Sequence, residues 1–522
     1  MFYLKWEKRI KKINETGVKV RFFFSVIANI LRVGLSFIAG MVIARTIGPG
    51  EYGDFNFLLG SFTSLAGLTD MASSSAFYTF SSQRQRGKKF FLYYGSWTLF
   101  QLLILLLLVL FLPTSIKQKI WLGYPFELVF LALLACFATN QLWRLATQFG
   151  ESIRDTVGVQ IRNVALAGTY LICIVILTVF HFVSIKNLFI LNVILFILFS
   201  AFYVLRIYQR GVLSNENPEN FTAVFKEFKS YCSPFVIYTG IGFLYSFADY
   251  WLLQKFGGSI QQGYYAIGAR FAAVSLLATN SMVDIFWKEI AEANSLGNME
   301  RVRLLYKFVS RSLYFISALI SCIMIPFSRE MLTLLLGHSY QDAWLPLSLM
   351  FLYPMQQAMG QITGTVLYAT GKTKTKSYTG ILVMAISIPT AYLLLAPKSA
   401  IMPGFNLGAV GLSLKMVACG ILSANLMAFF VSRNIKTDFN WGYQIIVLAL
   451  LLPIGYFSKF FAQSILSFVS FERYIILVML VSCIFYLVSV AVFVRFFPSI
   501  AGVNKDHINY GLSWLRTRIT PD

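Results

Sequence analysis

Apolar stretches recur along the whole chain, each about twenty residues long, and short polar segments separate them. A helix of this length crosses the hydrocarbon core of a bilayer and satisfies its own backbone hydrogen bonds there. The pattern predicts fourteen spans, near residues 22–44, 53–80, 90–112, 125–149, 158–182, 186–208, 231–255, 263–288, 306–336, 343–370, 378–396, 407–432, 442–463 and 473–497. We therefore expect an all-α integral membrane protein.

Several spans carry polar residues on one face. In the first span, Asn29, Arg32 and Ser36 recur at helical spacing, so they share one side of a helix. The polar residues inside later spans include Asp70, Asp249, Arg270, Asp284, Gln357, Gln361 and Lys415. Small polar residues also join helices to one another in lipid. Charged residues favour the other interpretation, a polar cavity between two lobes of the helix bundle.

Arg32 and Arg270 interrupt the apolar runs of the first and eighth spans. A charge at this depth costs from about 3 to more than ~10 kcal/mol, so such residues usually face a wet cavity or a charged partner. Both arginines are therefore candidate anion-binding cations. The alternative is a structural ion pair, for example Arg32 with Asp249 or Asp70. The aspartates could instead titrate during transport or act as fixed counter-ions.

Three further charged positions have alternative explanations. Lys415 lies about two turns from its helix end and could extend to the membrane surface instead of facing a cavity. Arg45 borders the first external turn and could simply cap it. Asp284 and Lys288 are four residues apart on a helix, a spacing typical of an ion pair.

Composition agrees with a membrane protein, because 57% of the residues are hydrophobic and only 13% are charged, with a mean hydropathy of +0.68. The net charge of +22 could indicate nucleic-acid binding. However, roughly three-quarters of the 44 lysines and arginines lie in one set of alternate segments between the spans. The positive-inside rule assigns that set and both termini to the cytoplasm, so we expect no nucleic-acid partner. The six cysteines lie in apolar segments without paired spacing, as small core residues do.

Two turns of the chain are similar to each other. The segment RTIGPGEYG (45–53) connects the first two spans, and KFGGSIQQG (255–263) connects the seventh and eighth. At a constant offset Gly48 meets Gly258 and Gly53 meets Gly263. The offset covers six helices, which predicts a parallel repeat. The predicted parts are a tail at 1–21, an N-lobe at 22–229, a C-lobe at 230–436, two extra helices at 437–497 and a tail at 498–522. The alternative is that two unrelated hairpins both turn at glycine.

The sequence contains no catalytic constellation. His181, His338 and His507 are far apart, and no P-loop, metal-ligand cluster or nucleophile motif is present. The longest connections, near 209–230 and 288–306, leave no room for a soluble domain. We therefore expect a transporter without catalytic activity, cofactor or metal.

Five segments together resemble a known family. They are ARTIGPGEYG (44–53), GYYAIGAR (263–270), LLGHSYQDA (335–343), ATGKTK (369–374) and LGAVG (407–411), and their order and spacing cover nearly the whole chain. The chain is similar to bacterial polysaccharide flippases, the oligosaccharide-lipid branch of the multidrug/oligosaccharidyl-lipid/polysaccharide exporter superfamily. Lys415 departs from the small or apolar residue that is usual at its position.

The resemblance implies two pseudosymmetric lobes and alternating access. It also implies export of an undecaprenyl-diphosphate-linked oligosaccharide across a bacterial inner membrane, for assembly of O-antigen lipopolysaccharide, capsule or exopolysaccharide. Related flippases of lipid-linked cell-wall precursors use cations in helices 1 and 8, which here are Arg32 and Arg270. A polysaccharide polymerase is then a candidate partner, together with membrane lipids.

Phosphate chemistry favours the same substrate class, because guanidinium groups bind phosphate bidentately and stay charged at any cellular pH. The candidate substrate-binding residues are Arg32, Arg270, Lys415, Arg45, Asn29, Gln357 and Gln361. Our hypothesis is that Arg32 and Arg270 clamp the diphosphate while the amides hydrogen-bond sugar or phosphate. Two alternatives are a cation-coupled multidrug antiporter of the same superfamily, whose cavity should favour acidic residues, and a non-transporting scaffold of a glycan-assembly complex.

Overall fold

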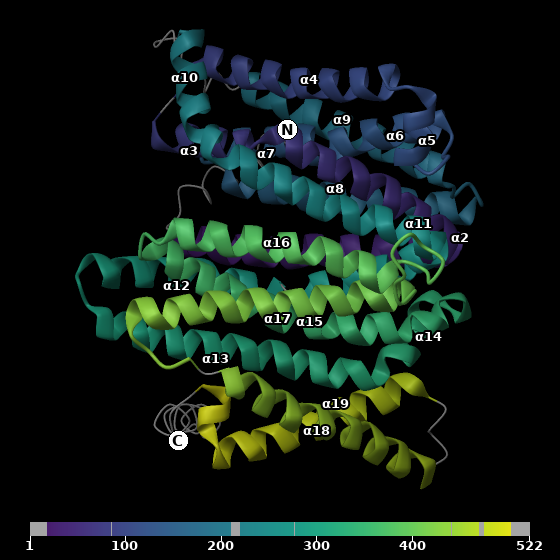
Figure 1. The fold of residues 1–522 in the computed structure, drawn as a ribbon, viewed down its shortest axis with the longest axis vertical. Helices are drawn as coiled ribbons and strands as arrows, with labels where there is room; N and C mark the ends of the chain where they lie inside the picture. The colour runs from purple at the N-terminus through teal and green to yellow at the C-terminus, as the bar shows by residue number, and fades with distance from the viewer. Residues whose placement is uncertain are drawn as a thin grey trace, which may run out of the picture. The chain divides into compact units, whose positions relative to one another are not determined.

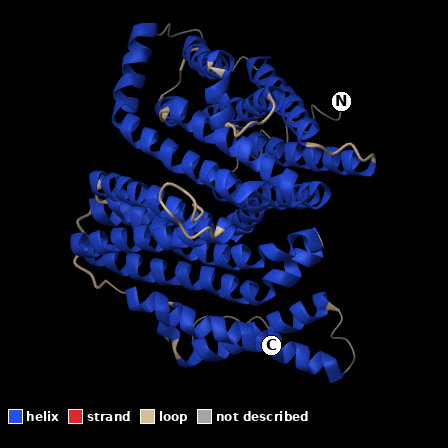
Figure 2. Cartoon of the chain, turned by 45° about the vertical axis from the view of Figure 1, so that its right-hand side comes forward, coloured by secondary structure: helices blue, strands red, loops and turns tan. Residues whose placement is uncertain are grey.

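The computed structural model describes residues 18–84, 86–209, 220–275, 277–439, 441–468 and 474–502. Within these ranges the side chains of residues 18–22 and 275–285 are outside the description. The described residues form helices joined by short loops, without a strand among them (Figure 2). The predicted all-α fold is therefore confirmed.

The helices follow one another with few long connections (Figure 1). In the first half of the chain they are α2 Val18–Asp70, α3 Ser73–Gln83, α4 Lys88–Phe111, α5 Thr114–Ile120, α6 Phe126–Cys136, the π-helix η1 Phe137–Leu142, α7 Trp143–Ser152, α8 Thr156–Val179, α9 Ile185–Gln209, α10 Phe221–Cys232 and the 3₁₀ turn η2 Ser233–Phe235. In the second half they are α11 Val236–Ser275, α12 Leu277–Ser295, α13 Met299–Met324, η3 Ile325–Phe327, α14 Ser328–Leu336, η4 His338–Ala343, α15 Trp344–Ala369, α16 Thr373–Leu395, α17 Gly408–Ile435, α18 Trp441–Phe468, α19 Ile475–Phe496 and η5 Pro498–Ala501.

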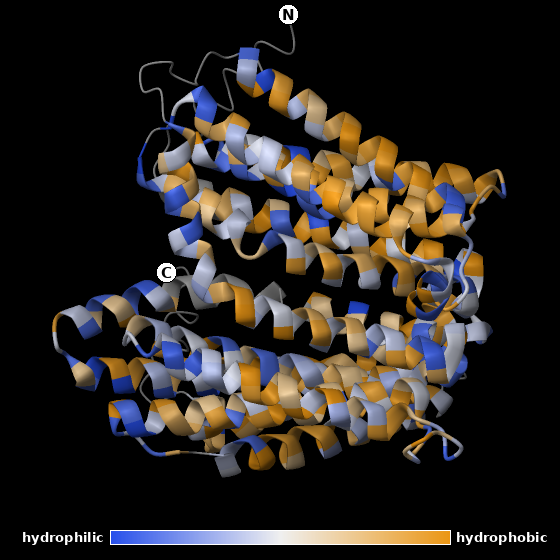
Figure 3. Ribbon diagram, turned by 45° about the horizontal axis from the view of Figure 1, so that its top comes forward, coloured by the Kyte–Doolittle hydropathy of each residue, from blue (hydrophilic) through white to orange (hydrophobic). Residues whose placement is uncertain are grey.

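Helices α2 and α11 each contain a kink at glycine. Gly48 has φ 76° and ψ 173°, and Gly258 has φ 77° and ψ −179°. When both helices are divided at these residues, each of the fourteen predicted spans overlaps at least one helical segment, and some, such as 53–80 and 125–149, overlap two or more. Ten of the described helical stretches are long and apolar enough to cross a membrane, and one of them, Phe23–Asp70, contains two predicted spans. Apolar residues run along these helices (Figure 3).

The chain divides into two compact units. Unit 1 comprises Met1–Gly263 and Ala391–Asn406, and unit 2 comprises Tyr264–Thr390 and Leu407–Asp522. The boundary lies later than the predicted lobe boundary at 229/230, because the first half of α11 belongs to unit 1. The limits of the predicted lobes stay a prediction.

The two glycine corners pack on each other inside unit 1. A Cβ atom on Gly53 would lie 1.8 Å from the carbonyl oxygen of Ser259, and one on Gly263 would lie 2.1 Å from that of Pro49. Ser259 stands at the repeat position of Pro49, so the two contacts are reciprocal, as in a two-fold interface. Together with the matching kinks, this confirms the predicted correspondence between the corners.

Each unit has its own aromatic and aliphatic core. In unit 1 the core joins α3, α4, α7, α8 and α9 through residues such as Phe77, Tyr94 and Tyr203. In unit 2 the two C-terminal helices α18 and α19 pack on α13 and its neighbours. A Cβ atom on Gly455 would lie 2.3 Å from the carbonyl oxygen of Cys322, so α18 and α13 approach closely there.

Candidate anion-binding pocket

A pocket of about 480 Å³ lies inside unit 1 and combines two arginines with hydroxyl and amide groups. Four elements line it, namely α2, η1, α7 and α8. Its lining residues are Arg32, Thr63, Ala66, Gly67, Thr139, Asn140, Trp143, Arg144, Thr147 and Asn163. This size and mixture are typical of a site for a polar small molecule or head group.

Arg32 reaches the pocket from the first half of α2. Its Nη2 donates a hydrogen bond of 2.7 Å to Oδ1 of Asn29, one turn earlier on the same face. The predicted polar stripe of the first span therefore brings these two candidate residues together. Because the amide oxygen accepts from only part of the guanidinium, the remaining N–H groups stay able to bind an anion.

The π-helix η1 contributes Thr139 and Asn140 to the lining of the pocket. A π-helix adds a residue to one turn, and such turns occur frequently at functional sites. Asn140, inside η1, donates through Nδ2 to Oγ1 of Thr63 on α2 at 3.2 Å. Arg144 and Thr147 follow on α7, so the widened turn decides which of their side chains line the pocket.

Within the described residues, neither Arg32 nor Arg144 forms an ion pair with a carboxylate. The nearby acids on α7 and α8 have other partners. Glu151 accepts from Thr156 at 3.0 Å, and Asp155 pairs with Arg162 at 3.3 Å. The pocket therefore carries two positive charges without a described carboxylate counter-ion.

Asp70 takes part in a different arrangement. Its carboxylate accepts from the Ser73 hydroxyl at 3.0 Å and from the Ser74 hydroxyl at 2.7 Å. Ser73 in turn accepts from Gln101 at 3.3 Å, and Gln101 accepts from Gln141 at 2.9 Å. These bonds join α2, α3, α4 and η1. The alternative in which Asp70 pairs with Arg32 is therefore wrong.

Asp249 and Arg45 are not among the residues that line the pocket. Asp249 is buried in the first half of α11. Arg45 is exposed, three residues before the kink at Gly48. Asp284 falls in the part of α12 whose side chains are outside the description. The roles predicted for these three residues stay predictions.

The other candidate residues belong to unit 2. Arg270 is half-buried on α11, and Gln357 and Gln361 lie one turn apart on α15, where Gln357 donates to the Tyr353 hydroxyl. Lys415 on α17 has an exposed fraction of 0%, so it does not extend to the membrane surface. The alternative in which Lys415 extends to the membrane surface is therefore wrong, and the substrate-binding role of Lys415 stays a prediction.

Sequence reasoning missed Arg144, which is the second cation of the pocket. The signal was present, because Asn140, Arg144 and Thr147 recur at helical spacing in the fourth predicted span, as Asn29, Arg32 and Ser36 do in the first. Arg144 lies near the end of that span, where an arginine can reach the membrane surface without cost. The free-energy cost expected for a charge at Arg144 is therefore lower than at Arg32, so the sequence indicates a functional role for Arg144 less strongly.

The fold of this chain is similar to the folds of several solved membrane transporters. The lipid II flippase MurJ in an inward closed conformation is similar to it, with a TM-score of 0.66 and 15% identity, and the alignment covers 91% of this chain and 99% of that one. At this identity the likeness concerns the fold alone.

Two other solved structures have the same fold. One is an inward-facing multidrug-resistance MATE family transporter, with a TM-score of 0.58, 14% identity and coverage of 77% of this chain and 94% of that one. The other is a MOP superfamily transporter from Pyrococcus furiosus, described by the reverse polarity of its binding pocket, with a TM-score of 0.53, 13% identity and coverage of 81% and 97%. No family model and no curated protein matches this chain in sequence.

Proposed function

We propose that this protein is a flippase that moves an undecaprenyl-diphosphate-linked oligosaccharide from the cytoplasmic to the external leaflet by alternating access. The observation that carries the proposal is the pair Arg32 and Arg144 in one pocket without a described carboxylate partner. A pocket of this charge favours an anion. Thr63, Asn140 and Thr147 supply the hydroxyl and amide groups that sugars require.

The physical problem of such transport is the head group, because a diphosphate with its sugars cannot enter hydrocarbon unaided. Each guanidinium offers a planar pair of donors to phosphate oxygens. Each charge-assisted hydrogen bond contributes about 1.5–3 kcal/mol. In this proposal Arg32 and Arg144 hold the diphosphate, and the lipid tail stays in the bilayer. The substrate-binding roles predicted for Arg270, Gln357, Gln361, Lys415 and Arg45 are further parts of this proposal.

The proposal is tested by replacing the arginines in a strain that lacks its own copy of the gene. Arg32→Ala and Arg144→Ala should each abolish surface polysaccharide while the protein stays in the membrane at normal level. Arg32→Lys and Arg144→Lys should keep part of the activity, because lysine keeps the charge but loses the bidentate geometry. Normal polymer from both alanine variants would refute the proposal.

Filling the pocket without changing its charge gives an independent test. Gly67 lines the pocket, and a Cβ atom added to it would have no other atom within 4 Å, so Gly67→Leu can enter the open space. Gly95 on α4 also has no such neighbour and does not line the pocket, so Gly95→Leu is the matched control. Gly67→Leu should block polymer formation, and Gly95→Leu should not.

A cation-coupled multidrug antiporter remains the second candidate, because a MATE transporter shares the fold. Its cationic cargo would be repelled by the two arginines of the pocket. Under this alternative, the alanine variants of Arg32 and Arg144 would leave polysaccharide intact and alter drug accumulation. A scaffold for glycan assembly would tolerate every one of these substitutions. The bacterial inner membrane, cytoplasmic termini and a polymerase partner are further parts of the main proposal.

A further inference from the structure

Helix α10 overlaps the connection predicted near residues 209–230, and one of its faces packs on α3 and α4. Val224 is buried there. Phe228 contacts three aromatic rings, those of Phe80 at 5.5 Å, Phe90 at 5.9 Å and Tyr94 at 5.9 Å between centroids. This aromatic packing holds α10 against α3 and α4.

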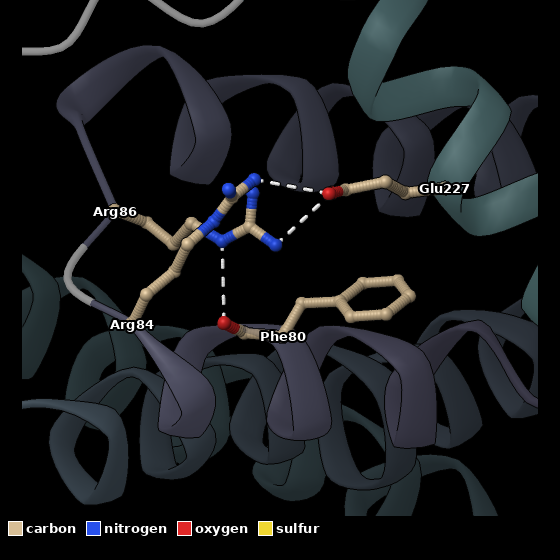
Figure 4. Close-up of polar contacts among 4 residues, drawn as sticks. All are labelled: Phe80, Arg84, Arg86 and Glu227. Carbon is tan, nitrogen blue, oxygen red and sulfur yellow. Dashed lines mark hydrogen bonds and ion pairs between the residues drawn. The ribbon is translucent and has the colours of Figure 1, made fainter.

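Two arginines from the α3–α4 connection fix the helix further. Arg84 and Arg86 both bind Glu227, at 2.9 and 3.0 Å, and Nε of Arg86 donates to the carbonyl oxygen of Phe80 at 3.2 Å (Figure 4). The Arg86 side chain is only 2% exposed. Glu227 is the one acidic residue of α10, so both arginines neutralise the only negative charge that the helix carries.

Beside its buried face, α10 presents exposed aromatic rings and lysines. Phe221 and Phe225 are 57% and 56% exposed and stack on each other at 6.0 Å. Lys226 and Lys229 are also exposed. Successive residues are rotated by about 100° around a helix. Phe221 and Phe225 therefore lie next to the buried face, and Lys226 and Lys229 lie on the far side of the phenylalanines. This order of apolar, aromatic and basic strips is typical of a helix that lies in a membrane interface.

The start of α4 extends the same surface. Tyr93 meets Phe221 edge to face at 5.3 Å, which places the beginning of α4 beside α10. Lys88 and Lys89 open α4, and Lys89 is exposed. None of the four lysines Lys88, Lys89, Lys226 and Lys229 pairs with a carboxylate among the described residues. We call these four lysines the basic rim.

We propose that α10 is an interfacial helix and that the basic rim binds the head groups of anionic phospholipids. The chain connects α10 to the apolar helix α9 on one side and to α11 on the other, so it stays near the end of membrane-spanning segments. Its exposed phenylalanines enter the boundary between head groups and acyl chains, while the lysines meet the phosphates. The basic rim alone would attract an acidic protein as well as an anionic membrane. The exposed phenylalanines beside it favour the lipid surface. This proposal does not rest on the transported substrate.

The first test measures lipid retention by the full-length protein. The protein is reconstituted in nanodiscs of phosphatidylcholine and phosphatidylglycerol in equal parts, and the lipids that it retains are counted by native mass spectrometry. A lysine near an anionic surface contributes about fivefold in affinity, so Lys226→Gln with Lys229→Gln should weaken phosphatidylglycerol retention by about 25-fold. Added salt should reduce the difference.

The matched control replaces Lys119 and Lys398 by glutamine, because both are exposed lysines of unit 1 outside the rim. Retention should be unchanged in this control. Equal losses in the two double variants, or equal retention of both lipids by the wild-type protein, would overturn the proposal.

The second test asks what touches the aromatic strip. The photoreactive residue p-benzoylphenylalanine is incorporated in place of Phe225 or, as a control, of Ser230, which is exposed on another side of α10. Illumination in native membranes should join position 225 to phospholipid more often than position 230. A protein adduct at position 225, or equal lipid adducts at both positions, would contradict an interfacial helix.

Discussion

The reciprocal contact between the glycine corners makes a sharp prediction for Gly53→Ala. The new Cβ atom would lie 1.8 Å from the Ser259 carbonyl oxygen, whereas ordinary contact begins at 3.4 Å. Both sides of this contact are backbone, so no side chain can rotate away. The two corners must move apart, and overpacking of this kind typically costs about 1–3 kcal/mol.

Gly50→Ala is the matched control, because it lies in the same corner and has no atom within 4 Å of an added Cβ. Alanine stabilises a helical position relative to glycine by about 0.5–1 kcal/mol, and both variants share this gain. The difference between them is therefore the packing cost alone, about 1–3 kcal/mol. Gly53→Ala should be the less stable of the two.

Thermal unfolding can be followed with a dye that becomes fluorescent on reaction with thiols. Cys136, Cys322 and Cys419 are buried and free, so they react only when the protein opens. Gly53→Ala should unfold at a lower temperature than Gly50→Ala. Gly263→Ala, whose Cβ atom would lie 2.1 Å from the Pro49 carbonyl oxygen, should behave like Gly53→Ala. The double variant with alanine at positions 53 and 263 should lose less stability than the two single variants together, because the first alanine already separates the corners. Equal midpoints for Gly53→Ala and Gly50→Ala would refute the close approach.

Two further predictions concern the same region of unit 1. Gly258→Ala should lower the free energy of unfolding by about 1–3 kcal/mol through backbone strain alone, because its φ of +77° with an extended ψ is accessible almost only to glycine. Its control is Gly240→Ala, in an unkinked part of the same helix, which should not destabilise the fold in the same thermal assay. Tyr124→Phe should cost about 1–2 kcal/mol, because it removes the hydroxyl that donates to Asp54. Burial raises the pKa of the Tyr124 hydroxyl, so in thermal scans the advantage of the wild-type protein should persist up to about pH 10, where unfolded tyrosine ionises, and should fall above it.

The polar pattern predicted part of the pocket correctly. Arg32 and Asn29 lie on one face because helical spacing is a local property, and the structure joins them by a hydrogen bond. That Arg32 and Arg144 line the same pocket does not follow from local spacing along the chain. It depends on α2 packing beside η1 and α7, where Asn140 binds Thr63 across many residues of chain. The π-turn itself left no signal in the hydropathy pattern.

The sequence by itself determined the helical membrane class and the correspondence of Gly48 with Gly258. These follow from hydrophobic runs and from turns, and both act over a few residues. Only the tertiary structure decided which cations share a pocket, which partners Asp70 uses and to which unit the first half of α11 belongs. Those outcomes depend on side chains and backbone atoms that meet across long stretches of chain, and single-helix periodicity cannot specify such distances. The basic rim depends on both levels, because the sequence shows its lysines as positive charge, whereas the orientation of α10 comes from the aromatic packing of Phe228.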